Sequence, residues 1–143
     1  LKENIKLLSE VDKSIKIHLH TNLKDSFLNC DKEQIARVFF NLIKNSIESI
    51  QQKAEKNTNF DKKIVIEIND NNDHIKISLV DNGIGFNNLD NNINEILSPY
   101  FTTKKDGTGL GLSIVNKIVN DHNGNIEFMS LDNGAKIKII FSK

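Results

Sequence analysis

Alternation of apolar and polar residues predicts the strands of this 143-residue chain. Five runs alternate with a period of two residues, as strands with one buried face do. They are residues 14–21, 64–68, 75–80, 125–131 and 135–141. The second and third runs flank a turn rich in Asn and Asp, and the last two flank Asp132-Asn133-Gly134, so each pair is expected to form a hairpin. A further short extended piece is expected at 26–29.

Apolar residues at helical spacing predict one long helix. Asp31 is a suitable N-cap, and neither Gly nor Pro interrupts the sequence from there to about Lys53. An apolar stripe with a period of 3.6 residues follows this segment and consists of Ile35, Phe39, Phe40, Leu42, Ile43, Ile47 and Ile50. The stripe indicates that one side of this helix packs against the predicted strands.

A shorter helix is expected from about Thr108 or Gly109 to Asp121, with Gly124 in the position of a helix stop. Residues 1–9 are weakly helical. Helices and strands in this order predict an α/β two-layer sandwich with a mixed sheet of about five strands.

Composition excludes several classes of function. The 19 basic residues balance 19 acidic ones, which argues against a nucleic-acid-binding protein. No apolar run approaches the roughly 18 residues of a membrane span, so we expect no direct membrane contact. Cys30 is alone, so neither an internal disulfide nor a cysteine metal site is expected. The chain begins at Leu1 without an initiator Met, and we expect it to be a fragment of a longer protein.

The polar face of the predicted long helix carries the first candidate site. Asn41 and Asn45 are four residues apart in mid-helix, where Asn is a poor helix former. A carboxamide oxygen is a hard, uncharged ligand that suits Mg²⁺. The other residues within about 60° of Asn41 are Gln34, Arg37, Lys44, Glu48 and Gln52. An Asn-rich composition explains the same pattern without a ligand, and both interpretations stay open at this point.

The second candidate site is Asp81-Asn82-Gly83-Ile84-Gly85, directly after the run 75–80. Two glycines at this spacing let the backbone approach a flat ligand closely. The Asp81 carboxylate is an acceptor that matches the exocyclic amine of a purine. A plain turn is the alternative explanation, because Asp-Asn-Gly is common turn chemistry.

Glycines also open the second predicted helix, in Gly107-Thr108-Gly109-Leu110-Gly111-Leu112. Free N–H groups and the helix dipole favour an anion there, although the spacing is neither a Walker P-loop nor the dinucleotide fingerprint. A flexible linker is the alternative. Just before it lies Pro99-Tyr100-Phe101-Thr102-Thr103-Lys104, whose lysine is either a phosphate ligand or a solvated cation beside buried rings. His18, His20, His74 and His122 are assigned no catalytic role.

Taken together, the four motifs resemble those of the catalytic and ATP-binding domain of bacterial sensor histidine kinases. The wider superfamily includes gyrase, the Hsp90 chaperones and MutL. Residues 41–48 are similar to its N box, 81–85 to its G1 box, 99–104 to its F box and 107–112 to its G2 box. The N, F and G2 boxes are most similar to the nitrogen-regulation type (NtrB/NtrY-like).

This resemblance implies a single Bergerat-type domain over residues 1–143, with an ATP lid at about 86–106. The implied fold is a mostly antiparallel five-stranded sheet covered on one face by about three helices. Phe86 departs from the small aliphatic residue that is commoner at its position, which affects only local packing.

The resemblance also implies ATP and Mg²⁺ as cofactors. Asn45 would bind Mg²⁺, Asn41 would help to hold the metal and the phosphates, and Asp81 would accept a hydrogen bond from the adenine amine. Lys104 and Lys44 would contact the phosphates, and the G2 box would wrap them. The remaining implied nucleotide-binding residues are Glu48, Gly83, Gly85, Phe101, Thr102, Gly107, Thr108, Gly109, Leu110, Gly111 and Leu112.

Position 41 separates two kinds of chemistry within the superfamily. Hydrolytic relatives carry a Glu there as the general base, whereas an amide takes up no proton at neutral pH. Asn41 therefore favours phosphoryl transfer over hydrolysis, with the nucleophile supplied from elsewhere. In the family that nucleophile is a histidine of a separate dimeric helical domain, and none of the four histidines here has its context.

The implied partners are the chain's own dimerisation and histidine phosphotransfer domain and the receiver domain of a response regulator. We expect the fragment to be monomeric and cytoplasmic, and the parent to be a homodimer in the inner membrane. The alternative function is a nucleotide-binding regulatory module of the same fold without phosphotransfer. A third alternative is a domain whose glycine loops serve no ligand.

Overall fold

The computed structural model describes residues 1–23, 28–86 and 111–143. In chain order its elements are α1 (Lys2–Ser9), β1 (Lys16–Thr21), α2 (Lys32–Lys56), β2 (Lys63–Asp70), β3 (His74–Asp81), α4 (Gly111–Asp121), β4 (Gly124–Leu131) and β5 (Gly134–Ser142). The strands form one sheet in the order β1-β2-β3-β5-β4. Only β1 and β2 pair in parallel, and the other neighbours are antiparallel.

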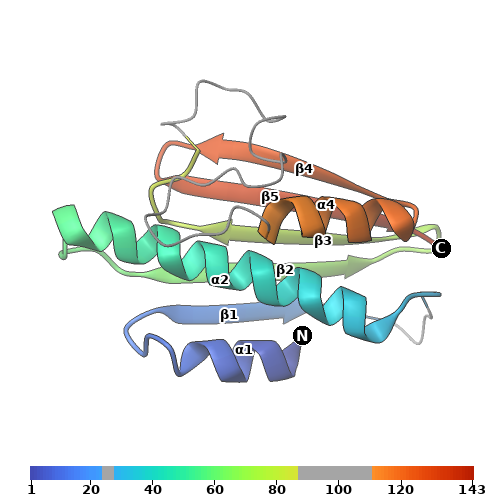
Figure 1. Cartoon of the computed structure of the whole chain (residues 1–143), viewed down its shortest axis with the longest axis horizontal. Helices are drawn as coiled ribbons and strands as arrows, with labels where there is room; N and C mark the ends of the chain where they lie inside the picture. Colours follow the sequence, from blue (N-terminus) through green and yellow to red (C-terminus); the bar gives the residue numbers. More distant parts are fainter. Residues whose placement is uncertain (24–27, 87–110) are drawn as a thin grey trace.

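The three described helices lie on one face of this sheet, with α2 running over β2 and α4 beside α2 (Figure 1). The predicted two-layer sandwich with a mixed, mostly antiparallel sheet is therefore confirmed. No helix among the described residues is long and apolar enough to cross a membrane.

The hydrophobic core fills the space between α2 and the strands. Asp31 caps α2 as predicted, because its carboxylate accepts hydrogen bonds from the backbone N–H groups of Glu33 and Gln34 at 2.9 and 3.1 Å. The apolar residues that α2 buries are Val38, Phe39, Leu42, Ile43, Ile47 and Ile50. Alternate strand residues such as Ile64 and Ile66 are fully buried in the same cluster. This packing fixes one edge of α2 against the sheet and leaves its polar edge for the candidate site.

α4 ends at Asp121 as predicted, but Gly124 is not the residue that stops it. The residue in the left-handed conformation is Asn123, with φ of 53°, and Gly124 is already the first residue of β4. Asn is the side-chain-bearing residue that adopts this conformation most readily, so it replaces glycine as the stop. Gly124 is required for another reason, because a Cβ there would lie 2.8 Å from the Phe141 ring and 2.9 Å from Val119.

Smaller differences concern element boundaries. The first strand begins at Lys16 rather than at residue 14, and α2 continues to Lys56, beyond the predicted Lys53. α4 is described from Gly111 onwards, and its predicted start at Thr108 or Gly109 lies outside the described residues. The predicted extended piece at 26–29 lies half outside the described residues, and residues 28 and 29 form no strand.

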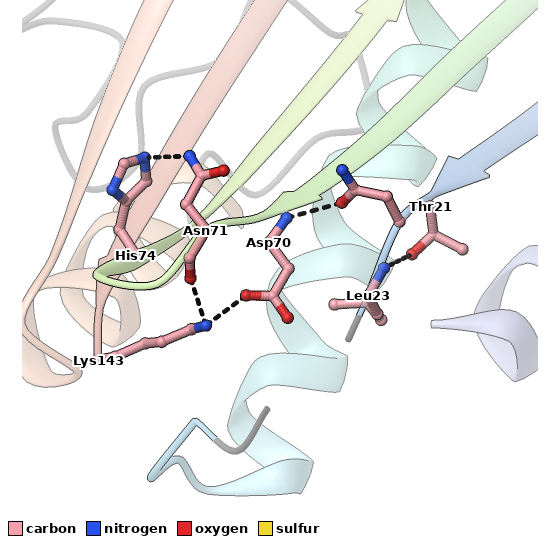
Figure 2. A network of polar contacts seen from close by, with 7 residues as sticks. Thr21, Leu23, Asp70, Asn71, His74 and Lys143 are labelled. Atoms are coloured by element: carbon pink, nitrogen blue, oxygen red, sulfur yellow. Dashed lines mark hydrogen bonds and ion pairs between the residues drawn. The ribbon is translucent and has the colours of Figure 1, made fainter. Parts of the chain in front are cut away.

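A polar network closes the sheet at the end where β2 leads into β3 (Figure 2). The Asp70 side chain is fully buried and forms an ion pair with Lys143, which also donates to the Asn71 carbonyl. The backbone N–H of Asp70 donates to the Asn22 side chain at 2.8 Å. Because β3 returns antiparallel to β2, this network and Asp81 lie at opposite ends of the sheet.

Candidate functional site

Two amide side chains of α2 face the start of α4. The Asn41 side chain donates to the Arg37 carbonyl at 3.0 Å, which orients it along the helix. A Cβ built on Gly111 would lie 3.5 Å from Asn41 Oδ1 and 3.8 Å from Asn45 Nδ2. The structure therefore brings the predicted N-box amides to the last glycine of the predicted G2 box. Gly111 is the first described residue of α4, and the N-terminal turn of a helix favours an anion.

Lys44 and Glu48 occupy the solvent side of the same stretch of α2. Lys44 Nζ lies 4.0 Å from Glu48 Oε1, one helical turn away, and the two side chains are 55% and 33% exposed. A pair of this kind is worth little in stability because water screens it. It does place one mobile cation and one carboxylate next to the two amides.

Asp81 is the last residue of β3, and only 4% of it is exposed. Its Oδ2 accepts from the Ser46 hydroxyl at 2.8 Å and its Oδ1 accepts from the Gly83 backbone N–H at 2.9 Å. Burial raises the pKa of this carboxyl group, whereas these two hydrogen bonds, a third from the Ala135 backbone and the charge of Lys53 act in the opposite direction. Because a carboxylate has about four acceptor positions, at least one remains for a ligand.

The loop after Asp81 is held by the second half of α2. The backbone N–H of Ile84 donates to the Ser49 hydroxyl at 3.0 Å, and Lys53 Nζ donates to the Asn82 carbonyl at 3.0 Å. The loop also packs directly on the helix at Gly83, where a Cβ would lie 2.7–2.8 Å from backbone atoms of Ser49 and Ile50. Glycine is required at position 83 because the helix backbone occupies the space of any side chain.

The turn between β4 and β5 supports the same loop from the other side. Gly134 has φ of +137° and lies so close to β3 that a Cβ would be 2.8 Å from the Asn82 Cα. Gly85, with φ of +69°, contacts the Gly134 carbonyl. The rings of Phe86 and Phe128 pack edge to face, with centroids 5.9 Å apart. The unusual aromatic residue at position 86 thus packs on β4.

Several predicted residues lie outside the described part of the chain. They are Phe101, Thr102, Lys104, Gly107, Thr108, Gly109 and Leu110. Of the predicted G2 box, Gly111 and Leu112 are described, and Leu112 packs partly buried against the core. The structure brings together Asn41, Asn45 and Gly111 as one group, and Asp81, Gly83 and Gly85 as a second group along the same helix.

Three residues that position the Asp81 loop were not predicted from the sequence: Ser46, Ser49 and Lys53. Ser46 is 2% exposed and lies within the apolar stripe of α2. A hydroxyl at such a position needs a hydrogen-bond partner, and this requirement was the available signal. Lys53 follows Ser46 by seven residues, or about two helical turns, so both lie on the same side of α2.

These residues fit an ATP molecule with its metal. Two carboxamide oxygens are suitable Mg²⁺ ligands, and a positively polarised helix start lies beside them. A buried carboxylate with a vacant acceptor position suits the amine of a purine. The arrangement therefore has a polar end for phosphates and a buried end for a base.

Comparison with known proteins agrees with this arrangement. Residues 30–143 match the family described as histidine kinase-, DNA gyrase B- and HSP90-like ATPases. The chain is 30% identical over 142 residues to the sensor histidine kinase ZraS of Escherichia coli O157:H7, covering 97% of this chain and 29% of that protein. It is 31% identical over 127 residues to a putative NtrY-like sensor histidine kinase of Rickettsia bellii, covering 89% and 20%. The chain thus spans less than a third of these relatives.

Among solved structures, the catalytic domain of the histidine kinase ThkA superposes with a TM-score of 0.80 at 31% identity. The match covers 99% of this chain and 89% of that domain. The sequence family, the relatives and the fold therefore agree. The chain belongs to the histidine kinase-, gyrase B- and HSP90-like ATPases and is an ATP-binding catalytic domain of the sensor histidine kinase type.

Proposed function

We propose that this domain binds Mg-ATP between α2 and α4 and donates the γ-phosphoryl group to a histidine of the parent's dimerisation domain. The phosphoryl group then passes to an aspartate of a response regulator. The observation that carries this proposal is the placement of Asn41 and Asn45 against Gly111, with Asp81 held farther along the same helix.

Each group has one task in this proposal. Asp81 accepts a hydrogen bond from the adenine amine, which selects adenine over a base with a carbonyl at that position. Asn45, with Asn41, holds Mg²⁺, and the metal neutralises charge on the transferring phosphoryl group. The start of α4 receives the phosphates, together with Lys44, Lys104 and the remaining G2 residues 107–110. Residues 86–106 act as the lid.

Transfer rather than hydrolysis follows from position 41. An amide side chain cannot deprotonate water, and Asn41 already donates a hydrogen bond to the Arg37 carbonyl. Catalysis then depends on positioning and charge neutralisation, with the attacking histidine brought by another domain. We expect the isolated chain to release phosphate from ATP at a negligible rate; rapid phosphate release would contradict phosphotransfer as its activity.

The proposed partners have a precedent among the similar structures. A histidine kinase ThkA structure in complex with the response regulator TrrA superposes with a TM-score of 0.74 at 28% identity, covering 99% of this chain and 39% of that one. By analogy, we propose a homodimeric parent in the inner membrane, with this domain on the cytoplasmic side, where ATP is available. This chain alone is then a monomer.

Calorimetric titration of the 143-residue chain with Mg-ATP tests the nucleotide site. Replacing Asn45 with Ala removes the proposed metal ligand, so we expect affinity to fall about tenfold and its dependence on Mg²⁺ to weaken. Asn120→Ala is the matched control, because it removes an exposed amide near the opposite end of α4. Equal affinities for all three proteins would contradict the proposed site.

A second experiment distinguishes a kinase from a regulatory module that binds the nucleotide without phosphotransfer. Mixing the chain with the parent's dimerisation domain and γ-labelled ATP is expected to label the acceptor histidine. ATP binding without any labelling would instead support the regulatory module, and absence of ATP binding would support a domain whose loops serve no ligand.

A further inference from the structure

The face of the sheet that the three described helices leave uncovered has a distinct charge. The strand register places alternate residues of all five strands on this face. Its charged members are the lysines 16, 63, 76, 136 and 138 and the glutamates 67 and 127. The whole chain is neutral, so this positive excess is a property of the face and not of the composition.

Part of this charge is balanced locally. Lys16 lies 3.5 Å from Asp61, and Lys138 lies 3.2 Å from Glu127. Of the three other lysines, Lys76 is the diagonal neighbour of Glu67 across β2 and β3. The positive excess is therefore centred on Lys63, which is at the start of β2, and on Lys136 of β5. Both lie at the same end of the sheet, since Val65 of β2 pairs with Val80 and Val80 pairs with Lys136.

A hollow with a volume of about 510 Å³ opens at this end of the sheet. Its apolar lining is formed by Phe60, Val65, Val80 and Leu131, and its cations are Lys53 and Lys63. The volume falls within the roughly 300–1,000 Å³ of pockets that bury a ligand. The hollow thus combines an apolar floor with a cationic rim.

The rim of the hollow keeps a positive excess, because its two lysines face one aspartate, whose charge interacts with that of Lys53. The only acidic residue that lines the hollow among the described residues is Asp81, whose two oxygens accept hydrogen bonds from Ser46 and Gly83. Lys53 is held in place, because it donates to the Asn82 carbonyl and lies 4.8 Å from the centre of the Phe60 ring. A ligand that enters the hollow therefore meets fixed positive charge beside apolar surface.

We propose that this hollow and the adjoining strands bind an extended acidic segment of a partner protein, with one apolar side chain placed over Val65 and Val80. Lys63 and Lys136 are on strands two steps apart, a separation of about 10 Å. An extended chain advances about 3.3 Å per residue, and its side chains alternate between two sides. Two carboxylates four positions apart, with an apolar side chain midway between them, therefore face the same surface and reach both lysines. The matching pattern is acidic, any residue, apolar, any residue, acidic. A polyphosphate chain lacks the apolar group that the floor accommodates.

This surface is separate from the proposed phosphate end of the nucleotide site. Asn41 and Asn45 are on α2, on the opposite side of the sheet, whereas Val65 and Val80 are on the uncovered face. The acidic segment and ATP therefore do not exclude each other at the phosphate end, whereas the hollow shares Asp81 with the proposed adenine end. The proposal holds whether or not the domain transfers a phosphoryl group to a histidine.

Fluorescence anisotropy of a labelled hexapeptide, Glu-Asp-Leu-Gly-Asp-Glu, tests the proposal with the 143-residue chain. We expect saturable binding that weakens at least tenfold in the double variant Lys63→Glu/Lys136→Glu. The control Lys2→Glu/Lys32→Glu makes the same charge change at exposed positions in the first turns of α1 and α2, and we expect less than a twofold effect. Thermal unfolding and ATP titration of each variant report whether its fold is retained.

Two further peptides test whether the apolar residue and the acidic residues of the peptide each contribute to binding. Replacing the peptide's Leu with Ser is expected to weaken binding several fold, and replacing its acids with Lys is expected to abolish it. The proposal is overturned if the Ser peptide binds as tightly as the Leu peptide, or if the two double variants behave alike. Tighter binding of a duplex DNA of equal charge would also overturn it, since that ligand has no apolar anchor.

Discussion

Asp81 has to remain ionised where burial opposes ionisation. Replacing it with Asn removes the buried charge, keeps a carbonyl acceptor for Gly83 and keeps nearly the same shape. We therefore expect Asp81→Asn to unfold at the same or a higher temperature than the natural chain, measured by circular dichroism. We expect its affinity for ATP to fall at least tenfold, because the amide presents a donor where the adenine amine needs an acceptor.

A loss of stability together with a loss of affinity would mean that the Asp81 carboxylate is structural rather than a base-binding group. Asp12 is a matched control, because it is also a hydrogen-bonded aspartate but lies in the turn before β1. Asp12→Asn is expected to leave ATP affinity unchanged.

The raised pKa of Asp81 predicts how stability depends on pH. Between the ordinary Asp value of about 3.9 and the raised folded value, the folded state holds a proton that the unfolded state has released. The contribution of Asp81 to the free energy of unfolding therefore falls as pH rises through this window. Urea unfolding at several pH values is expected to show this slope in the natural chain and not in Asp81→Asn.

At the residue scale, the sequence predicted the candidate ligand-binding groups better than the groups that orient them. Asp81 could be identified because it ends a strand and precedes two glycines. Ser46 could not, because the helical period places it in the apolar stripe and its partner is 35 residues away. Long-range hydrogen bonds of this kind depend on tertiary packing, which local patterns do not contain.

At the scale of elements, α2 and the Asp81 loop act as one unit. Gly83→Ala introduces a methyl group into the backbone of α2 near Ser49, so we expect the loop to move and the hydrogen bond between Ile84 and Ser49 to break. Strain of this kind typically costs about 1–3 kcal/mol of unfolding free energy. Chemical denaturation measures this loss, and ATP titration is expected to show weaker binding.

Gly111→Ala provides the contrast. Its Cβ would be no closer than 3.5 Å to its neighbours, an ordinary contact, and Ala suits a helix. We expect this variant to keep its unfolding free energy to within about 0.5 kcal/mol. If both substitutions destabilised the chain equally, close packing at Gly83 would not be the cause.

Element types were well predicted because their periods are strong, and element ends were predicted less well. The start of α2 was correct, since Asp31 carries a capping side chain. Its end was missed by three residues because Ala54 and its neighbours give no stop signal. The stop of α4 was wrong by one residue because Asn123 competes with Gly124 for the left-handed conformation.

At the scale of the whole molecule, the network around Asp70 joins the last residue of the chain to the β2–β3 turn (Figure 2). Lys143→Met removes the cation, so the fully buried Asp70 carboxylate loses the positive charge that stabilises it. Breaking a buried ion pair in this way costs about 3–5 kcal/mol. Thermal unfolding is expected to detect this loss, and ATP affinity measured well below the transition is expected to stay unchanged.

The double variant Asp70→Asn/Lys143→Met is the matched control. It removes both charges, so we expect part of the lost stability to return. A stability equal to that of Lys143→Met would show that the ion pair contributes nothing. A change in ATP affinity would contradict the separation between this end of the sheet and Asp81.

The order of strands in the sheet could be predicted only in part. Two hairpins follow from short turns, but β5 lies between β3 and β4, and β1 pairs with β2 in parallel. No local period specifies those two neighbours, because they depend on which buried faces meet across α2 and α4. The resemblance of the four motifs to a known family implied a mostly antiparallel sheet but not this order.

The single parallel pairing has a consequence for the order in which the chain assembles. A short turn joins β2 to β3, whereas the segment between β1 and β2 contains the whole of α2. Lys16 and Lys63 therefore pair across a long loop. Closing that long loop costs entropy before any contact of β1 compensates for it. β3 and β5 also meet across a long segment, from Asp81 to Gly134, so both non-local pairings are expected to form after the two hairpins. The helix that carries Asn41, Asn45 and Ser46 lies within the loop that the parallel pairing closes, so the docking of β1 is expected to depend on the packing of that helix.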